Sequence, residues 1–278
     1  MKHTSPVSGN KPVVAQKSTK KGGKTSPAVH GLGGVRDAPD ARDHPYVPPP
    51  AVLSNLPSKV DLRKQFPPVY NQGQVNSCTA NAIAGAMEFD ALRQKMKEVY
   101  TPSRLFVYYN ERLIEGTEGK DVGGQIRDGI KSIANQGDCP EPHWPYKEEM
   151  VIQKPPDECY SQARGFKALE YQRISHNLDH MRACLASGFP FVFGIKVFSS
   201  FQGQAVADSG RLNMPRKGEK SVGLHAVVAC GYDDSQRRFI VRNSFGSGWG
   251  MKGYFTIPYA YLMDSKISHD FWTIRVVR

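Results

Sequence analysis

Apolar residues in the first half of the chain recur at helical spacing. After a turn-prone run at 71–76, apolar positions from Cys78 to Phe89 follow at steps of four, four and three, which predicts a helix with Ser77 as its N-cap. Two more helices are predicted, at 102–110 with Ser103 or Thr101 near its start, and at 124–135. Residues 140–160 are rich in proline and have no period, which predicts a surface loop.

From about residue 166 onward the pattern changes to short apolar runs, which are typical of strands. A short helix is expected from Met181 to Ser187, ended by Gly188. Strands are predicted at 189–197, 223–232, 238–242, 254–257 and 271–277. The sequence therefore predicts an α+β fold, with a helical lobe at 54–165 and a mostly antiparallel β lobe at 166–278.

Residues 1–53 follow neither period. They are rich in Pro, Gly, Ser and Lys, a composition that buries too little apolar surface to order itself, and 45–50 reads as a polyproline-like stretch. We expect a disordered or extended segment that leads into the domain. No apolar run matches the core of a Sec signal peptide or a membrane span, so we expect a cytoplasmic protein or export by a non-Sec route.

The positive charge of the chain lies mostly in its first 30 residues. The formal net charge is +11, and residues 1–30 contain six lysines and no acidic residue, so this tail supplies +6 and the rest +5. A binding protein whose tail contacts nucleic acid or an anionic surface is therefore one hypothesis. Because aromatic residues do not alternate with these lysines, nucleic acid is not the favoured partner.

Three residues together suggest nucleophilic catalysis. Cys78 would begin a helix, where unpaired N–H groups and the positive end of the helix dipole favour a thiolate over a thiol. His225 at the start of one predicted strand and Asn243 at the end of the next follow at separations of 147 and 18 residues. This order and spacing are typical of a nucleophile, a base and a residue that orients the base.

Six motifs in the same order resemble the papain family of cysteine peptidases, in particular its bacterial branch. They are Val60–Arg63, Asn71–Gly73 followed by Ser77–Cys78, Gly123–Gly124, Trp144–Tyr146, His225–Val227 and Asn243–Gly246. The resemblance covers residue 57 to the C-terminus. It implies a papain-like two-lobe fold whose active site lies in the cleft between the helical lobe and the β lobe.

The resemblance also implies roles for individual residues. Cys78 and His225 would form a thiolate–imidazolium pair, which Asn243 would orient. Gln72 and the Cys78 backbone N–H would stabilise the oxyanion. Phe245 stands where most members have Trp and would shield the His225–Asn243 contact from water.

Substrate binding is implied at both ends of the cleft. Gly123 and Gly124 match the glycine pair that lets an extended peptide approach closely, and Leu224 precedes the base. Trp249 resembles the aromatic platform beyond the cleaved bond.

The remaining cysteines have no implied catalytic role. Cys184 and Cys230 lie in apolar segments and are expected to be buried thiols, whereas a disulfide between Cys139 and Cys159 stays open. Val75 replaces a cysteine that many members use for a disulfide beside the nucleophile, and Asn76 replaces a common glycine. No Cys or His spacing matches a zinc site, so no metal or other cofactor is expected.

The sequence thus predicts a monomeric cysteine endopeptidase that acts on proteins or peptides through a thioester acyl-enzyme. Residues 31–53 are extended and rich in proline, and we expect them to lie in the cleft as an internal ligand and restrain the enzyme. A papain-like acyl or amide transferase is an alternative, because a thioester does not determine whether water or an amine receives the acyl group.

Overall fold

The computed structural model describes residue 1, residues 30–165 and residues 169–276. Of the segment 1–53, predicted to be disordered or extended, residues 2–29 lie outside the described residues and residues 30–53 within them. Within these ranges no helix is both long and apolar enough to cross a membrane.

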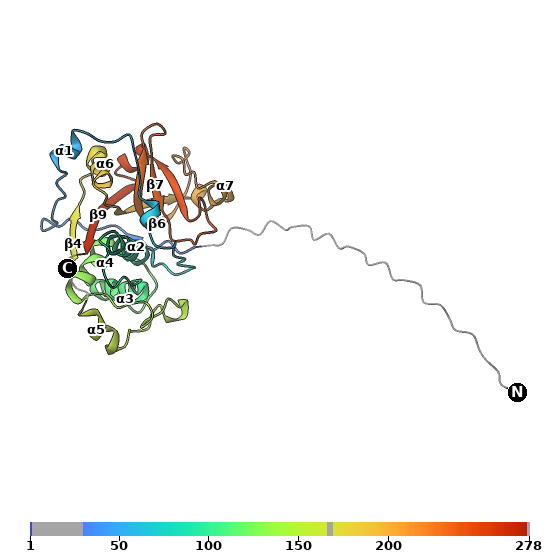
Figure 1. Ribbon diagram of the computed structural model, residues 1–278. Coiled ribbons are helices and arrows are strands. Elements are labelled where there is room, and N and C mark those ends of the chain that lie inside the picture. Colours follow the sequence, from blue (N-terminus) through green and yellow to red (C-terminus); the bar gives the residue numbers. More distant parts are fainter. Residues whose placement is uncertain (2–29, 166–168, 277–278) are drawn as a thin grey trace.

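A sheet of seven strands forms one half of the described molecule, and four helices group on one side of it (Figure 1). The helices of this group are α2 (Cys78–Arg93), α3 (Arg104–Glu115), α4 (Ile126–Gln136) and α5 (Asp157–Ala163). The other helices are α1 (Pro50–Leu53), α6 (Leu178–Ala186), α7 (Gln204–Ser209) and α8 (Tyr259–Met263). Short 3-10 turns lie at Arg63–Gln65, Glu148–Met150 and Ser199–Gln202.

The strands pair antiparallel in the order β4-β9-β5-β6-β7-β8, and β2 pairs with β6 outside this path. Their bounds are β2 (Lys59–Asp61), β4 (Leu169–Arg173), β5 (Phe191–Phe198), β6 (Ser221–Asp233), β7 (Arg238–Arg242), β8 (Tyr254–Pro258) and β9 (Ser268–Val276). A small parallel pair joins β1 (Gly34–Val35) to β3 (Gly124–Gln125). The predicted α+β fold with an antiparallel β half is confirmed.

Local capping explains where two of the helices begin. The Ser103 hydroxyl accepts from the Phe106 N–H at the start of α3, as predicted. Asn177 accepts from two backbone N–H groups, so α6 begins at Leu178, three residues before its predicted start. Asp157 begins α5 inside the region predicted as a loop.

The sheet is buried on both faces, which is why β5 reads as a continuous apolar run. Val192 and Val228 contribute to the core that contains α2, whereas Phe191 and Phe193 contribute to the core on the other face. This packing holds the start of α2 against β6, where His225 lies.

Candidate active site

Cys78 is the first residue of α2, and its side chain is 0% exposed. Ser77 is the N-cap residue, as predicted, but its side chain makes no capping hydrogen bond. Its hydroxyl instead bonds to the Tyr146 hydroxyl at 2.6 Å and accepts from Asn81 Nδ2 at 3.0 Å. These contacts fix the turn that carries the cysteine.

His225 on β6 and Asn243 after β7 come together because the two strands pair. His225 Nε2 lies 2.8 Å from Asn243 Oδ1, and a carbonyl oxygen only accepts, so Nε2 carries the proton in the neutral ring. Nδ1 is then the basic nitrogen, and it is buried with no hydrogen-bond partner among the described residues. The ring of Phe245, the residue predicted to shield this contact, stacks on His225 with centroids 4.9 Å apart.

Gln72 is fully buried and held at both ends of its amide. Its Oε1 accepts from the Ser244 hydroxyl at 2.5 Å, and its Nε2 donates to Val75 O at 2.8 Å and to Gly31 O at 3.2 Å. The side-chain amide therefore presents a donor to the N-terminal segment.

The N-terminal segment passes through this site. We call residues 30–47 the strap. Gly33 bridges to Leu224 on one wall, and its carbonyl accepts from the Gly124 N–H at 2.9 Å on the other. At one end His30 stacks on Phe245 with centroids 4.0 Å apart. Two of the four residues predicted to bind substrate, Gly124 and Leu224, make these backbone contacts. The other two are Gly123 and Trp249.

The fit of the strap depends on glycine. A Cβ on Gly33 would lie 1.8 Å from the Asn76 carbonyl oxygen, and one on Gly31 would lie 2.3 Å from that of Val75. One on Gly123 would lie 1.9 Å from Gly33 O, and its φ of +86° favours glycine as well. Only a chain without side chains at 31 and 33 reaches this depth.

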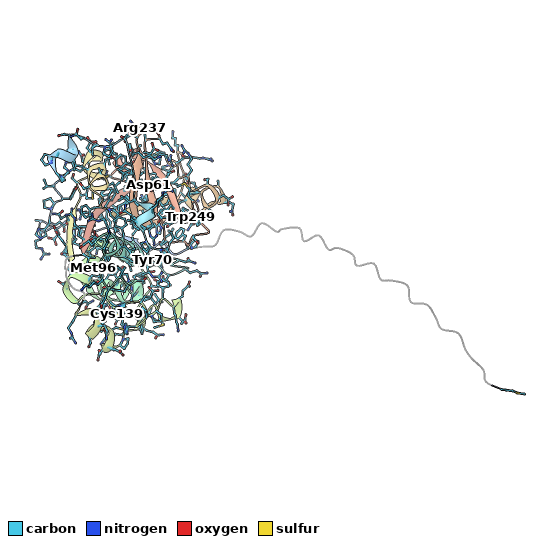
Figure 2. The ribbon with its side chains drawn as sticks, in the orientation of Figure 1. Asp61, Tyr70, Met96, Cys139, Arg237 and Trp249 are labelled. Carbon is cyan, nitrogen blue, oxygen red and sulfur yellow. The ribbon has the colours of Figure 1, made fainter. Side chains whose placement is uncertain are left out.

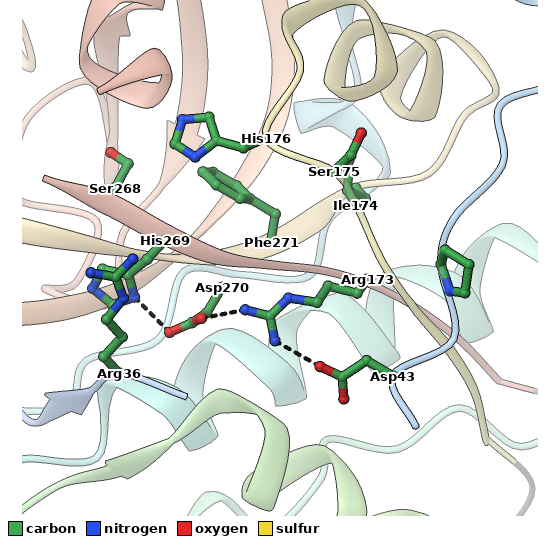
Figure 3. Close-up of a pocket in the computed structure, with 11 residues that line it drawn as sticks. Arg36, Asp43, Arg173, Ile174, Ser175, His176, Ser268, His269, Asp270 and Phe271 are labelled. Carbon is green, nitrogen blue, oxygen red and sulfur yellow. Dashed lines mark hydrogen bonds and ion pairs between the residues drawn. The ribbon is translucent and has the colours of Figure 1, made fainter. Parts of the chain in front are cut away.

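Beyond the cleft, a buried cluster of charges anchors the strap, and we call it the clasp. It consists of Asp37 and Asp43 from the strap, Arg127 from α4, Arg173 from β4 and Asp270 from β9. Figure 3 shows Arg173 between Asp270, at 2.7 Å, and Asp43, at 2.9 Å, in the wall of a pocket of about 310 Å³. The Trp272 indole also donates to Asp37 at 2.8 Å. No pattern in the sequence had indicated these residues.

Covered by the strap, the cysteine and histidine favour their neutral forms. Burial raises the pKa of Cys78 to about 11, although the N–H groups of Ala226 and Gly33 partly oppose it. Burial lowers the pKa of His225 to about 4, although its bond to Asn243 partly opposes the shift. The predicted thiolate–imidazolium pair is therefore not the favoured state of the covered site, because burial outweighs the helix dipole.

This shift predicts how the full-length protein reacts with a thiol alkylator. A thiol with a pKa of about 11 holds about 0.01% thiolate at pH 7. We expect labelling of Cys78, measured by mass spectrometry of its peptide, to be slow and to rise continuously from pH 6 to pH 10. A fast rate that is already constant at pH 5 to 6 would indicate an ion pair and would contradict a covered site.

The tryptophan and the four other cysteines considered in the sequence are all buried. The ring of Trp249 packs edge-on against that of Phe245 with centroids 5.6 Å apart, where the sheet meets the helices (Figure 2). Cys139 and Cys159, for which a disulfide was open, are both free thiols, and Cys184 and Cys230 are buried as predicted.

Comparisons with known proteins agree with this geometry. A sequence model described as papain family cysteine protease matches residues 56–272. An uncharacterized peptidase C1-like protein of Acanthamoeba polyphaga mimivirus is 40% identical over 277 residues, which cover 91% of this chain and 89% of the relative. The crystal structure of xylellain, a cysteine protease from Xylella fastidiosa, is 42% identical with a TM-score of 0.85, and the match covers 91% of this chain and 99% of xylellain. The bromelain protease from Ananas comosus, at 22% identity and a TM-score of 0.61, shares the fold; the match covers 80% of this chain and 100% of bromelain.

Proposed function

The chain belongs to the papain family of cysteine proteases and is a hydrolase, and from this premise we propose that Cys78, His225 and Asn243 carry its reaction and that the strap keeps it latent. The 2.8 Å bond between His225 Nε2 and Asn243 Oδ1 carries the catalytic assignment. It leaves Nδ1 as an acceptor for the thiol proton.

The reaction follows from these groups. Once the strap leaves, Nδ1 of His225 accepts the proton of Cys78, and the thiolate attacks the carbonyl carbon of a peptide bond. The imidazolium then gives its proton to the leaving amine, and a thioester remains on Cys78. Water, deprotonated by His225, attacks the thioester and releases the carboxylic acid and the thiol.

Gln72 stabilises the negatively charged oxygen that forms in each attack. Its Nε2 donates to Gly31 O in the covered cleft, and we propose that with the Cys78 backbone N–H it binds the oxyanion of a substrate. Because Ser244 holds Oε1, the amide cannot turn its acceptor toward the developing charge.

Substrate binding is proposed to reuse the strap's contacts. The Gly124 N–H and the backbone at Leu224 pair with Gly33, and they would pair with an extended peptide in its place. Phe245 and Trp249 would lie beside the residues after the cleaved bond.

Several observations support latency. With the strap in the cleft, Cys78 and His225 are both 0% exposed. The Gly33 N–H faces the sulfur, so the strap presents a donor there instead of a carbonyl carbon. It therefore occupies the cleft without offering this bond for attack, and the clasp holds it beside the site.

An amine test separates hydrolysis from acyl transfer. We expect the full-length protein, acting on a fluorogenic peptide, to release mainly the carboxylic acid even with glycinamide at millimolar concentration, because water is the proposed acceptor. Mass spectrometry of the products measures the split. If the glycinamide adduct predominated, the transferase alternative would replace the peptidase.

A further inference from the structure

The peptide bond between Arg36 and Asp37 divides the strap into two parts with different surroundings. The part before this bond fills the cleft, whereas Asp37, the first residue after it, is buried in the clasp. Val35 and Arg36 are exposed on one side of the bond, and residues 38 and 39 are exposed on the other. A cut at this bond would therefore free the part in the cleft and leave the clasp complete.

The backbone nitrogen of Asp37 already meets a buried carboxylate. It donates to Asp270 Oδ2 at 2.8 Å, and Asp270 is 3% exposed. Nδ1 of His269, 2.6 Å from the same oxygen, donates to it and adds no charge while the ring is neutral. Figure 3 shows Asp270 between His269 and Arg173. Hydrolysis of the bond before Asp37 would turn this nitrogen into an α-ammonium group, and the hydrogen bond would become an ion pair.

The clasp lacks one positive charge in the uncut chain. With neutral His269 it holds the three carboxylates of Asp37, Asp43 and Asp270 but only the two guanidinium groups of Arg127 and Arg173. Burial and the nearby Asp270 carboxylate raise the pKa of Asp37 to about 6. An ammonium group on the backbone nitrogen of Asp37 would balance this charge inside the cluster.

The acceptor is held in place before any ammonium group forms. Asp270 has a φ of +56°, which is uncommon for a residue other than glycine, and the pairing of β5 with β9 changes register beside it. Arg173 donates to its Oδ1 at 2.7 Å, so Oδ2 is left for the nitrogen of Asp37 and the ring of His269. A conformation of this kind persists where the surrounding contacts fix it.

We propose that a peptidase that cuts after arginine activates the enzyme between Arg36 and Asp37, and that the clasp is the binding site for the new amino terminus. Water adds across the bond and yields the Arg36 carboxylate and the Asp37 α-ammonium. The part in the cleft loses its tether and leaves, whereas the ammonium pairs with Asp270. Residues 37–46 then stay in the active enzyme. This inference rests on the proposed latent peptidase.

Limited digestion of the full-length protein by trypsin, stopped with soybean trypsin inhibitor, tests the cut. Wild type is compared with Arg36→Gln and with Arg42→Gln, a change of another exposed arginine of the strap. We expect the intact mass of residues 37–278 from wild type and Arg42→Gln. Their kcat/KM for a peptide without lysine or arginine should rise roughly 100-fold. Arg36→Gln should keep this bond and stay latent.

The reactivity of the new amino terminus tests its binding site. Acetylation of the Asp37 α-amine at pH 7.5, followed by mass spectrometry, is compared between cut wild type and a synthetic peptide of residues 37–47. We expect a roughly 100-fold lower rate in the protein, because an ion pair with a buried carboxylate disfavours the free amine. In cut Asp270→Asn most of this protection should be lost. If that variant does not fold, the comparison of wild type with the peptide decides alone.

Acetylation as fast as in the peptide, or equal activation of Arg36→Gln and wild type, would overturn the proposal. Gly33→Val, whose added Cβ would not fit the cleft, separates this inference from the function on which it rests. If cut wild type stayed inactive while Gly33→Val hydrolysed the peptide, this inference would fail and the proposed function would stand. If neither hydrolysed it, the proposed function would fail, and this inference with it.

Discussion

Replacing Cys78 by alanine should abolish peptide hydrolysis, with a loss of kcat on the order of 10⁶-fold. The proposed mechanism has no other nucleophile that could form the thioester, and His225 without the thiol has no proton to accept. Hydrolysis of a fluorogenic peptide measures the loss.

Cys159→Ala is the matched control for this change. It removes a buried thiol from α5, outside the proposed catalytic group, so activity should stay near that of wild type. Retention of wild-type activity by Cys78→Ala would reject the whole catalytic assignment. His225→Ala provides a second check, since it should lose activity to a similar extent while Cys78 remains available for labelling.

Periodicity was sufficient to predict the elements that carry the site. Cys78 begins α2 as predicted, and His225 and Asn243 lie on and just after predicted strands. The errors concern side chains whose partners are distant in sequence. Ser77 is the N-cap residue, but its hydroxyl bonds to Tyr146, 69 residues away, and not to the first turn of its helix, and no local pattern reports such a contact.

The clasp could not be found from the sequence for the same reason. Asp37 lies in a stretch of polar residues and proline that reads as solvent-exposed, yet its backbone N–H bonds to Asp270, 233 residues further on. The protonation state of Cys78 could not be predicted from its neighbours in the sequence either. The helix dipole acts within one turn of Cys78, whereas the burial that outweighs it involves residues far away in the sequence, among them Gly33 of the strap and Ala226.

Two groups make strap binding depend on pH in opposite directions. His225 has a lowered pKa in the covered cleft and should regain an ordinary value when uncovered, so protonation between about pH 6.5 and 4 favours the open cleft. Burial raises the pKa of Asp37 to about 6 in the closed clasp, so protonation of Asp37 favours the closed form over the same range. Tests of the strap therefore need a fixed pH, and pH 7.5 lies above the range in which either shift acts.

At that pH, Gly33→Val in the full-length protein should raise kcat/KM for a small peptide and speed up alkylation of Cys78. The added side chain would have its Cβ 1.8 Å from the Asn76 backbone oxygen, which cannot move aside without disturbing the start of α2. A tethered segment acts at an effective concentration on the order of 1 mM. If the free strap bound with a Kd of about 10 µM, its release would raise activity roughly 100-fold.

Gly119→Ala is the control, because a Cβ there would meet no atom within 4 Å. A chain that begins at Arg36 gives a second route to an open cleft and keeps the clasp. A chain that begins at Leu53 would also remove Asp37 and the buried Tyr46 and so uncover the partners of both. We therefore expect the chain from Arg36 to be active with a melting temperature near that of wild type, and the chain from Leu53 to melt at a lower temperature.

A synthetic peptide of residues 30–47 should inhibit Gly33→Val, whereas the same peptide with valine at position 33 should not. Equal kcat/KM and equal labelling rates for wild type, Gly33→Val and the chain from Arg36 would show that the strap does not restrain the enzyme.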